Sequence, residues 1–92
     1  MNTGAGQRRE EGMPTVLKKY GIRFHFYGSD MGEPPHIHAS GQGGKAKVWL
    51  HSGEMAECKG FNTVDVKRIL SVVEEHKVEF LEAWDDFFGS IS

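Results

Sequence analysis

The spacing of apolar side chains changes once along this chain, and that change determines the class of fold. From residue 22 to residue 50 apolar and polar residues alternate, which is typical of strands buried on one face; Ile22 to Tyr27 is the clearest run. After Gly60 the apolar residues recur at helical spacing as far as Phe88. A sheet with one apolar face and a helix with one apolar stripe both expose apolar surface to water, and packing them together buries both.

We therefore predict an α+β domain in which an antiparallel meander of four to five strands is packed on one face by a long C-terminal helix. His76 and Lys77 interrupt the apolar stripe of this helix, and a rod of about 40 Å is long for so small a sheet. We expect the helix to be kinked or broken near His76. The sheet residues predicted to face the helix are Ile22, Phe24, Phe26, Ile37, Ala39, Ala46, Val48 and Leu50.

Length and composition indicate one domain within the chain. Ninety-two residues are too few for two separate cores. Residues 1–12 are polar and glycine-rich, so we predict a disordered tail there, a single α+β domain over residues 13–89, and a natural start at Met13. No apolar run approaches the ~20 residues that span a bilayer, no signal peptide is visible, and Cys58 is the only cysteine. We therefore expect a cytoplasmic protein that does not enter a membrane.

The second face of the predicted sheet collects the polar and aromatic residues of the strands. Successive side chains of a strand point to opposite faces, so these residues should point away from the helix. Four of the five histidines are among them. This predicted polar face consists of Arg23, His25, Tyr27, His36, His38, Lys45, Lys47, Trp49 and His51. We expect it to be open to solvent.

The run His36-Ile37-His38 has the most specific chemical use on this face. Histidines two apart on a strand lie about 6–7 Å apart at Cα, so both rings can reach one Zn²⁺ at about 2.0–2.1 Å. His25 on the neighbouring strand, or Glu33 before the two prolines, would supply a third ligand. Three ligands and an open position would make a metal-dependent hydrolase or nuclease. Without metal, the histidines would serve acid–base catalysis or simply form hydrogen bonds on an exposed strand.

Two binding functions are the alternatives to an enzyme. Trp49, Tyr27 and Lys47 would contact a single-stranded nucleic acid, although a sequence pI of about 6.2 and a net charge of −2 do not favour this. Ordinary cross-strand packing of aromatic rings and lysine stems would explain the same residues. Exposed Trp, Tyr and Arg also anchor protein interfaces, so a protein partner, or a homodimer through the uncovered face, is predicted.

Several runs of residues resemble one protein family. They are Met13-Pro14-Thr15-Val16-Leu17, Arg23-Phe24-x-Phe26-Tyr27, Glu33-Pro34-Pro35-His36-Ile37-His38, Lys47-x-Trp49-Leu50, Gly60-Phe61 and Glu82-Ala83-Trp84. Over residues 13–89 the chain resembles the small bacterial family known as domain of unknown function 4160. The resemblance implies a start at Met13 and a protein partner, because such proteins occur beside another small domain in contexts typical of toxin–antitoxin or mobile-element operons. It implies no catalytic residue.

Our leading prediction is therefore a binding or interaction module, associated with a toxin–antitoxin system, that acts through the histidine-rich sheet face. A hydrolase or nuclease that uses His36 and His38 is the first alternative, and a single-stranded nucleic-acid binder is the second.

Overall fold

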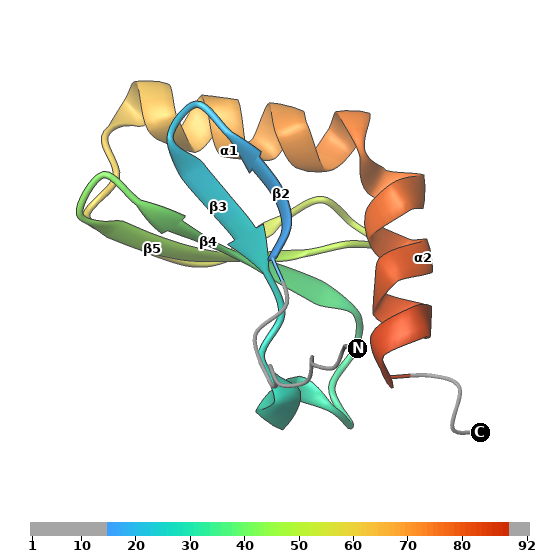
Figure 1. The fold of residues 1–92 in the computed structure, drawn as a ribbon. Coiled ribbons are helices and arrows are strands. Elements are labelled where there is room, and N and C mark those ends of the chain that lie inside the picture. The colour runs from blue at the N-terminus through green and yellow to red at the C-terminus, as the bar shows by residue number, and fades with distance from the viewer. Residues whose placement is uncertain (1–14, 89–92) are drawn as a thin grey trace, which may run out of the picture.

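Neighbouring strands are joined in chain order, so the sheet is a meander. In the computed structural model, which describes residues 15–88, the strands lie in the order β2-β3-β4-β5-β6 and all neighbours are antiparallel (Figure 1). The predicted meander is confirmed, with five strands. Their bounds are β2 Thr15–Lys19, β3 Ile22–His25, β4 His36–Gly41, β5 Gly44–Trp49 and β6 Met55–Lys59, and a short 3-10 helix, η2 (Gly28–Asp30), lies between β3 and β4. The tail predicted over residues 1–12 and the predicted start at Met13 lie outside the described residues.

A two-residue turn fixes the register of the β4–β5 hairpin. Gln42 and Gly43 have φ of 54° and 80°. Two successive residues with positive φ form the hairpin turn whose twist matches that of the flanking strands, and glycine adopts this conformation without steric cost. The turn sets Ser40 opposite Lys45 and so fixes every pair of side chains between the two strands. Register therefore decides which residues lie side by side on each face.

The apolar side chains of the sheet form one core with the helices, as the alternation predicts. All eight sheet residues predicted to face the helix are buried, and each large side chain fully removed from water contributes roughly 1.5–3 kcal/mol. The helices add Ile69, Val72, Val73, Phe80 and Trp84 to this core.

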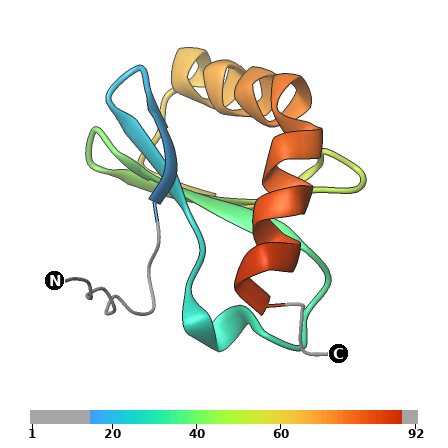
Figure 2. The ribbon, with the colours of Figure 1, turned by 45° about the vertical axis from the view of Figure 1, so that its right-hand side comes forward.

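The C-terminal helical segment is broken at His76, where the sequence predicts it. α1 spans Thr63–Glu75, α2 spans Lys77–Phe88, and His76 between them has φ −109° and ψ 19°. Asn62 caps α1, since its side chain accepts a hydrogen bond from the Asp65 amide at 2.8 Å. α1 lies across the apolar face, whereas α2 turns and runs along the end of the sheet (Figures 1 and 2). Neither helix in the described part of the chain has the length and apolarity to span a membrane.

Trp84 of α2 contacts both sides of the sheet at this end. Its ring lies 5.4 Å from the ring of Phe26, in the core, and 5.2 Å from the ring of His36, which belongs to the polar face by strand parity. We predicted that the helix would stay on the apolar face. That holds for α1, but the break at His76 lets α2 reach a histidine of the polar face.

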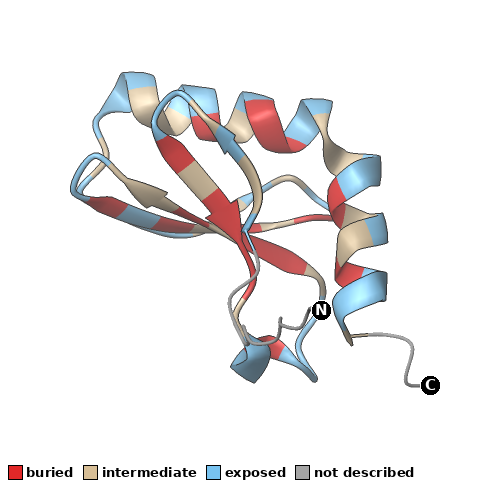
Figure 3. Cartoon of the chain, viewed as in Figure 1, coloured by how far each residue is buried: buried red, intermediate tan, exposed pale blue. Residues whose placement is uncertain are grey.

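Apart from His51, the polar face has the predicted members, but it does not have the predicted exposure. His25 and His36 are 0% exposed and His38 is half-buried. Figure 3 shows the buried stretches of the strands in red. Strand parity is correct, because Ile37 between the two histidines of β4 points into the core. The prediction of an open face is wrong at its histidine-rich end, because the β3–β4 connection and α2 lie against it. His51 differs in another way: it is exposed in the loop after β5 rather than on a strand.

Candidate metal centre

The strand register arranges the polar side chains in rows that run across the sheet. His25, His38, Lys47 and Glu57 lie opposite one another on β3 to β6. The next row lies two residues closer to the β4–β5 turn and contains Arg23, Ser40, Lys45 and Lys59. In the other direction, His36 lies opposite Trp49. One end of the polar face is therefore rich in histidine and aromatic rings, and the other end is basic.

The connection between β3 and β4 covers the histidine-rich end. Tyr27 packs its ring edge-on against the rings of His25 and His38, at centroid distances of 5.0 and 4.5 Å. η2 follows, and the amide of Asp30 donates to the carbonyl oxygen of Tyr27 at 3.0 Å. This turn brings Asp30 back over the sheet, where it is only 6% exposed.

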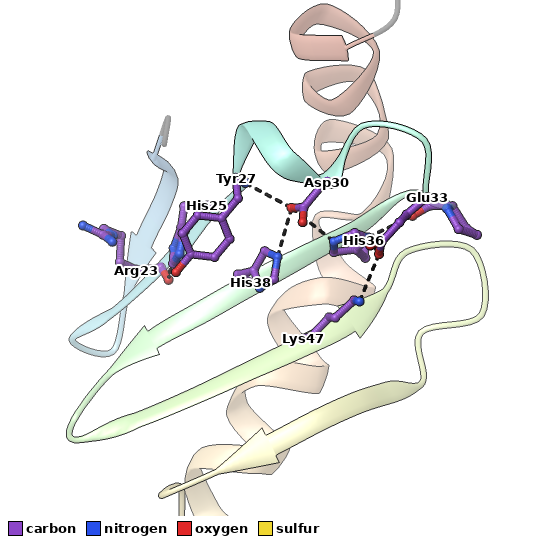
Figure 4. A network of polar contacts seen from close by, with 9 residues as sticks. Arg23, His25, Tyr27, Asp30, Glu33, His36, His38 and Lys47 are labelled. Carbon is purple, nitrogen blue, oxygen red and sulfur yellow. Dashed lines mark hydrogen bonds and ion pairs between the residues drawn. The ribbon is translucent and has the colours of Figure 1, made fainter. Parts of the chain in front are cut away.

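The side chains of Asp30, His36 and His38 point toward one another (Figure 4). Oδ2 of Asp30 lies 3.1 Å from Nε2 of His36 and 3.0 Å from Nε2 of His38. The amide of Tyr27 donates to the same oxygen at 3.1 Å. The ligand atoms of the three side chains all lie within 4.8 Å of one another, which is close enough for one metal ion to bind all three. We call these three residues the Asp-His-His cluster.

The hydrogen bonding of His36 directs an unpaired nitrogen at the carboxylate. Nδ1 of His36 lies 2.9 Å from the carbonyl oxygen of Pro34, and a carbonyl only accepts, so Nδ1 carries the proton of this bond. In a neutral ring Nε2 then holds a lone pair. This Nε2 is buried and, within residues 15–88, lacks a partner with hydrogen-bond geometry, although Oδ2 of Asp30 is 3.1 Å away. Two electron-rich atoms this close require a proton or a cation between them.

The environment of the cluster also sets its protonation. Burial lowers the pKa of His38 below 6.5, and this outweighs the Asp30 carboxylate, which acts in the opposite direction. Burial raises the pKa of Asp30, but the Tyr27 amide and the charges of His36 and His38 outweigh it and hold this pKa below 3.8. At neutral pH Asp30 is therefore a carboxylate and His38 is neutral. In the hydrogen bond to Asp30 the proton lies on Nε2 of His38, so a metal ion bound at this atom would displace that proton to Nδ1 or to solvent.

Neither of the two residues predicted as a third ligand belongs to the cluster. His25 stacks on His38 at a centroid distance of 5.8 Å, but its Nδ1 faces the carbonyl oxygen of Arg23 at 3.4 Å. Burial, followed by the charge of Arg23, lowers the pKa of His25 to about 4. Glu33 pairs with Lys47 at 3.1 Å and lies 3.8 Å from Nδ1 of His36, on the side away from the cluster. Asp30 takes the third position instead.

The three residues predicted to contact a nucleic acid are engaged within the domain. The ring of Trp49 packs edge-on against His36 at 5.5 Å, and Nζ of Lys47 lies 4.8 Å from the centroid of the Trp49 ring. Tyr27 packs on the histidines as described above. The contact of Trp49 with His36 joins two strands, as in the cross-strand packing that we named as the alternative to base stacking.

Asp30 is the site residue that the sequence-based prediction missed. The signal for it was present but not specific: residues 26–35 join the two histidine-bearing strands and contain two carboxylates, Asp30 and Glu33. A carboxylate in such a connection must lie near the ends of both strands. Which of the two reaches the histidines depends on η2, which the sequence pattern does not predict.

Comparison with known proteins identifies one family. The model of the family described as Domain of unknown function (DUF4160) matches residues 21–85. This span contains the whole polar face and the Asp-His-His cluster. Comparisons with curated proteins and with solved structures give no match.

Proposed function

The chain belongs to the DUF4160 family, and we propose that it binds one divalent transition-metal ion, best matched by Zn²⁺, and uses it for hydrolysis. Asp30, His36 and His38 would be the ligands. One observation carries the proposal: Nε2 of His36 is buried, lacks a hydrogen-bond partner in the described residues, and lies 3.1 Å from Oδ2 of Asp30. A cation bound by both atoms converts this repulsive contact into two favourable ones.

The neighbours of the cluster support a metal ion. Zn²⁺ takes imidazole nitrogen and carboxylate oxygen, and two histidines with one carboxylate form a ligand set of catalytic zinc sites. A metal-bound histidine commonly donates its second ring N–H to a carbonyl or carboxylate, as His36 does to Pro34. The amide of Tyr27 holds Asp30 in turn. The ligands are thus oriented before the ion binds, which reduces the cost of ordering them.

The competing explanation for this geometry is a proton. If His36 were cationic, its Nε2–H would face Asp30, and the three side chains would form a buried ion pair that only holds the β3–β4 connection in place. Such a pair needs no metal, so the stability of the protein would not respond to adding or removing one. The two explanations therefore predict different responses of the protein's stability to added or removed metal.

Hydrolysis fits the surroundings of the cluster. Three protein ligands leave a coordination position of Zn²⁺ for water, and bound Zn²⁺ lowers the pKa of that water to about 7. A groove of about 630 Å³ lies beside His38 and Tyr27. This volume is within the range of roughly 300–1,000 Å³ for small-molecule sites. A substrate therefore has room next to a metal ligand.

Calorimetric titration of the chelator-treated full chain with Zn²⁺ tests the metal centre. We expect one ion per chain, and binding weakened at least about tenfold by Asp30→Asn or His38→Ala. His51→Ala is the matched control, because His51 is exposed and outside the cluster. Zn²⁺ binding that is absent, or that all three variants weaken equally, would refute the centre.

A second measurement addresses hydrolysis separately. The Zn²⁺-loaded protein and its Asp30→Asn variant are compared on a panel of activated carboxylate and phosphate esters. We expect turnover that needs both the metal and Asp30. Stoichiometric metal binding without any such turnover would leave a metal site that is not hydrolytic.

The protein partner, the homodimer and the toxin–antitoxin association stay predictions. Because His25 and His36 are buried, a partner on this face would meet lysines and the partly exposed side chains of Trp49 and His38 instead of those two rings.

A further inference from the structure

A row of basic residues lies on the polar face at the end away from the Asp-His-His cluster. Strand register places Lys18, Arg23, Ser40, Lys45 and Lys59 opposite one another on five adjacent strands. We call these five residues the basic row. It contains four bases, one hydroxyl and no carboxylate. Opposite residues on one face of an antiparallel pair have Cβ atoms about 4.5–5.5 Å apart, so their charges act on one another.

The positive charge of the basic row is not balanced within the described residues. Lys45 and Lys59 are exposed and directly opposite each other, and like charges in such positions destabilise a sheet. Over residues 15–88 no base of the row forms an ion pair, whereas the neighbouring Lys47 is paired with Glu33 at 3.1 Å. Nε of Arg23 is buried there without a hydrogen-bond partner. The exposed ammonium groups of Lys45 and Lys59 are thus available for an anion, and the buried N–H of Arg23 is a donor without an acceptor in the described residues.

The groove described above connects the basic row to the cluster. Its lining includes Ser40, Lys45 and Lys59 of the basic row and also His38 and Tyr27. His38 and Ser40 are two residues apart on β4, which corresponds to about 6–7 Å along a strand. A small molecule with its anionic group among the lysines would therefore extend to a metal ligand.

We propose that Lys45, Lys59 and Ser40, assisted by Arg23, bind the phosphate group of a small phosphorylated molecule. Ammonium, guanidinium and hydroxyl donors suit the oxygen atoms of a phosphate, and its negative charge offsets the repulsion between the two lysines. This inference rests on the proposed hydrolysis, because it names the class of substrate that would be hydrolysed. The bond to be hydrolysed lies in the part of the molecule that extends to His38, and the phosphate serves as the anchor.

Size and charge favour a small molecule over a nucleic-acid strand. The groove has the volume of a small-molecule site, and its wall includes the acidic Glu57. The chain has a net charge of −2 and a sequence pI of about 6.2, whereas domains that bind nucleic acids commonly have a pI above about 9.

NMR and calorimetric titrations of the full chain test the phosphate site. The protein is first stripped of metal with a chelator, which is then removed, and it is titrated with inorganic phosphate, adenosine monophosphate and adenosine. We expect the first two to shift the amide signals of Ser40, Lys45 and Lys59, and adenosine to leave them in place. The double variant Lys45→Gln/Lys59→Gln should weaken binding of the monophosphate at least about tenfold. Lys67→Gln, which removes an exposed lysine of α1, is the matched control and should not.

The same variants separate this proposal from the metal centre. Lys45→Gln/Lys59→Gln should retain Zn²⁺ binding, and Asp30→Asn should retain phosphate binding. The phosphate site is refuted, whatever the Zn²⁺ result, if neither phosphate compound moves the three signals or if Lys67→Gln weakens binding as much as the double variant. Binding of a single-stranded oligonucleotide without binding of the monophosphate would overturn it as well. Removing two opposed like charges should not lower the melting temperature, so a loss of binding reports on the site rather than on unfolding.

Discussion

Oδ2 of Asp30 lies 3.1 Å from Nε2 of His36, and the two atoms come from different kinds of structure. His36 is fixed in β4, whereas Asp30 ends η2 in the connection between β3 and β4. The position of this connection therefore depends on what lies between the carboxylate and the imidazole. Metal binding and local stability should be coupled through this contact.

Removing the Asp30 side chain should destabilise the metal-free protein. Asp30→Ala deletes the acceptor of the Tyr27 amide and the partner of His38, and we expect a loss of about 1–3 kcal/mol in the free energy of unfolding. Asp30→Asn keeps an oxygen that accepts from Tyr27, so its loss should be smaller. Urea denaturation of the three proteins measures this order. Equal stability of wild type and Asp30→Ala would show that the contacts of Asp30 contribute nothing without metal.

Zn²⁺ should raise the stability of the folded chain. An ion that binds only the folded state, at about 100 times its Kd, adds about 2.7 kcal/mol to the free energy of unfolding. We expect a higher melting temperature with Zn²⁺, its reversal by a chelator, and a clearly smaller rise in Asp30→Asn. Thermal unfolding followed by circular dichroism measures all three. An unchanged melting temperature in the wild type would favour the buried ion pair over the metal.

Acidification should destabilise the metal-free protein between pH 6.5 and about 4 through His25. Burial, Arg23 and His38 lower the pKa of His25 to about 4, against the opposing effects of the Arg23 carbonyl and of Asp30. In this range the unfolded chain binds a proton that the folded chain excludes, so stability falls as the pH falls, in total by on the order of 3 kcal/mol. Denaturation at several pH values should show this slope, flattened in His25→Phe and retained in His51→Ala.

Trp84 should support both the core and the cluster. Trp84→Ala removes a ring that contacts Phe26 and His36 and is 7% exposed, so we expect a loss of about 3–5 kcal/mol in stability. In the fraction that stays folded, Zn²⁺ should also bind more weakly, because His36 loses a wall of its pocket. Val78→Ala, at a position of α2 that is 67% exposed, should change stability by less than about 0.5 kcal/mol. Unchanged Zn²⁺ affinity in Trp84→Ala would mean that β4 alone orients His36.

Local periodicity was sufficient to predict most of the fold. Ile37 and Val48 enter the core because their positions alternate with polar residues, and the interruption at His76 marks the end of α1. The pairing of His36 with His38 follows from the same two-residue period. Periodicity describes one strand at a time, however, so it predicts the face of a side chain and not what lies above it.

The parts that were not predicted depend on segments outside the strands. His36 is buried because α2 turns at the end of the sheet, and the cluster is completed by Asp30 because η2 folds back over β4. Both depend on the conformation of a few residues between regular elements, where the sequence has no period. This is why His25 and Glu33 appeared to be equally good ligands, and why the carboxylate nearest to His36 was not identified.

The contacts of Trp84 have a consequence for the cooperativity of the domain. One indole ring forms part of the boundary of the apolar interior and part of the boundary of the histidine cluster, so the two regions share a common wall. An ion held by His36 would therefore anchor α2, and fraying of α2 from its C-terminal end would loosen the ion. Binding of an ion at the centre would therefore stabilise the last turns of α2 and, through Trp84, the packing of the hydrophobic interior.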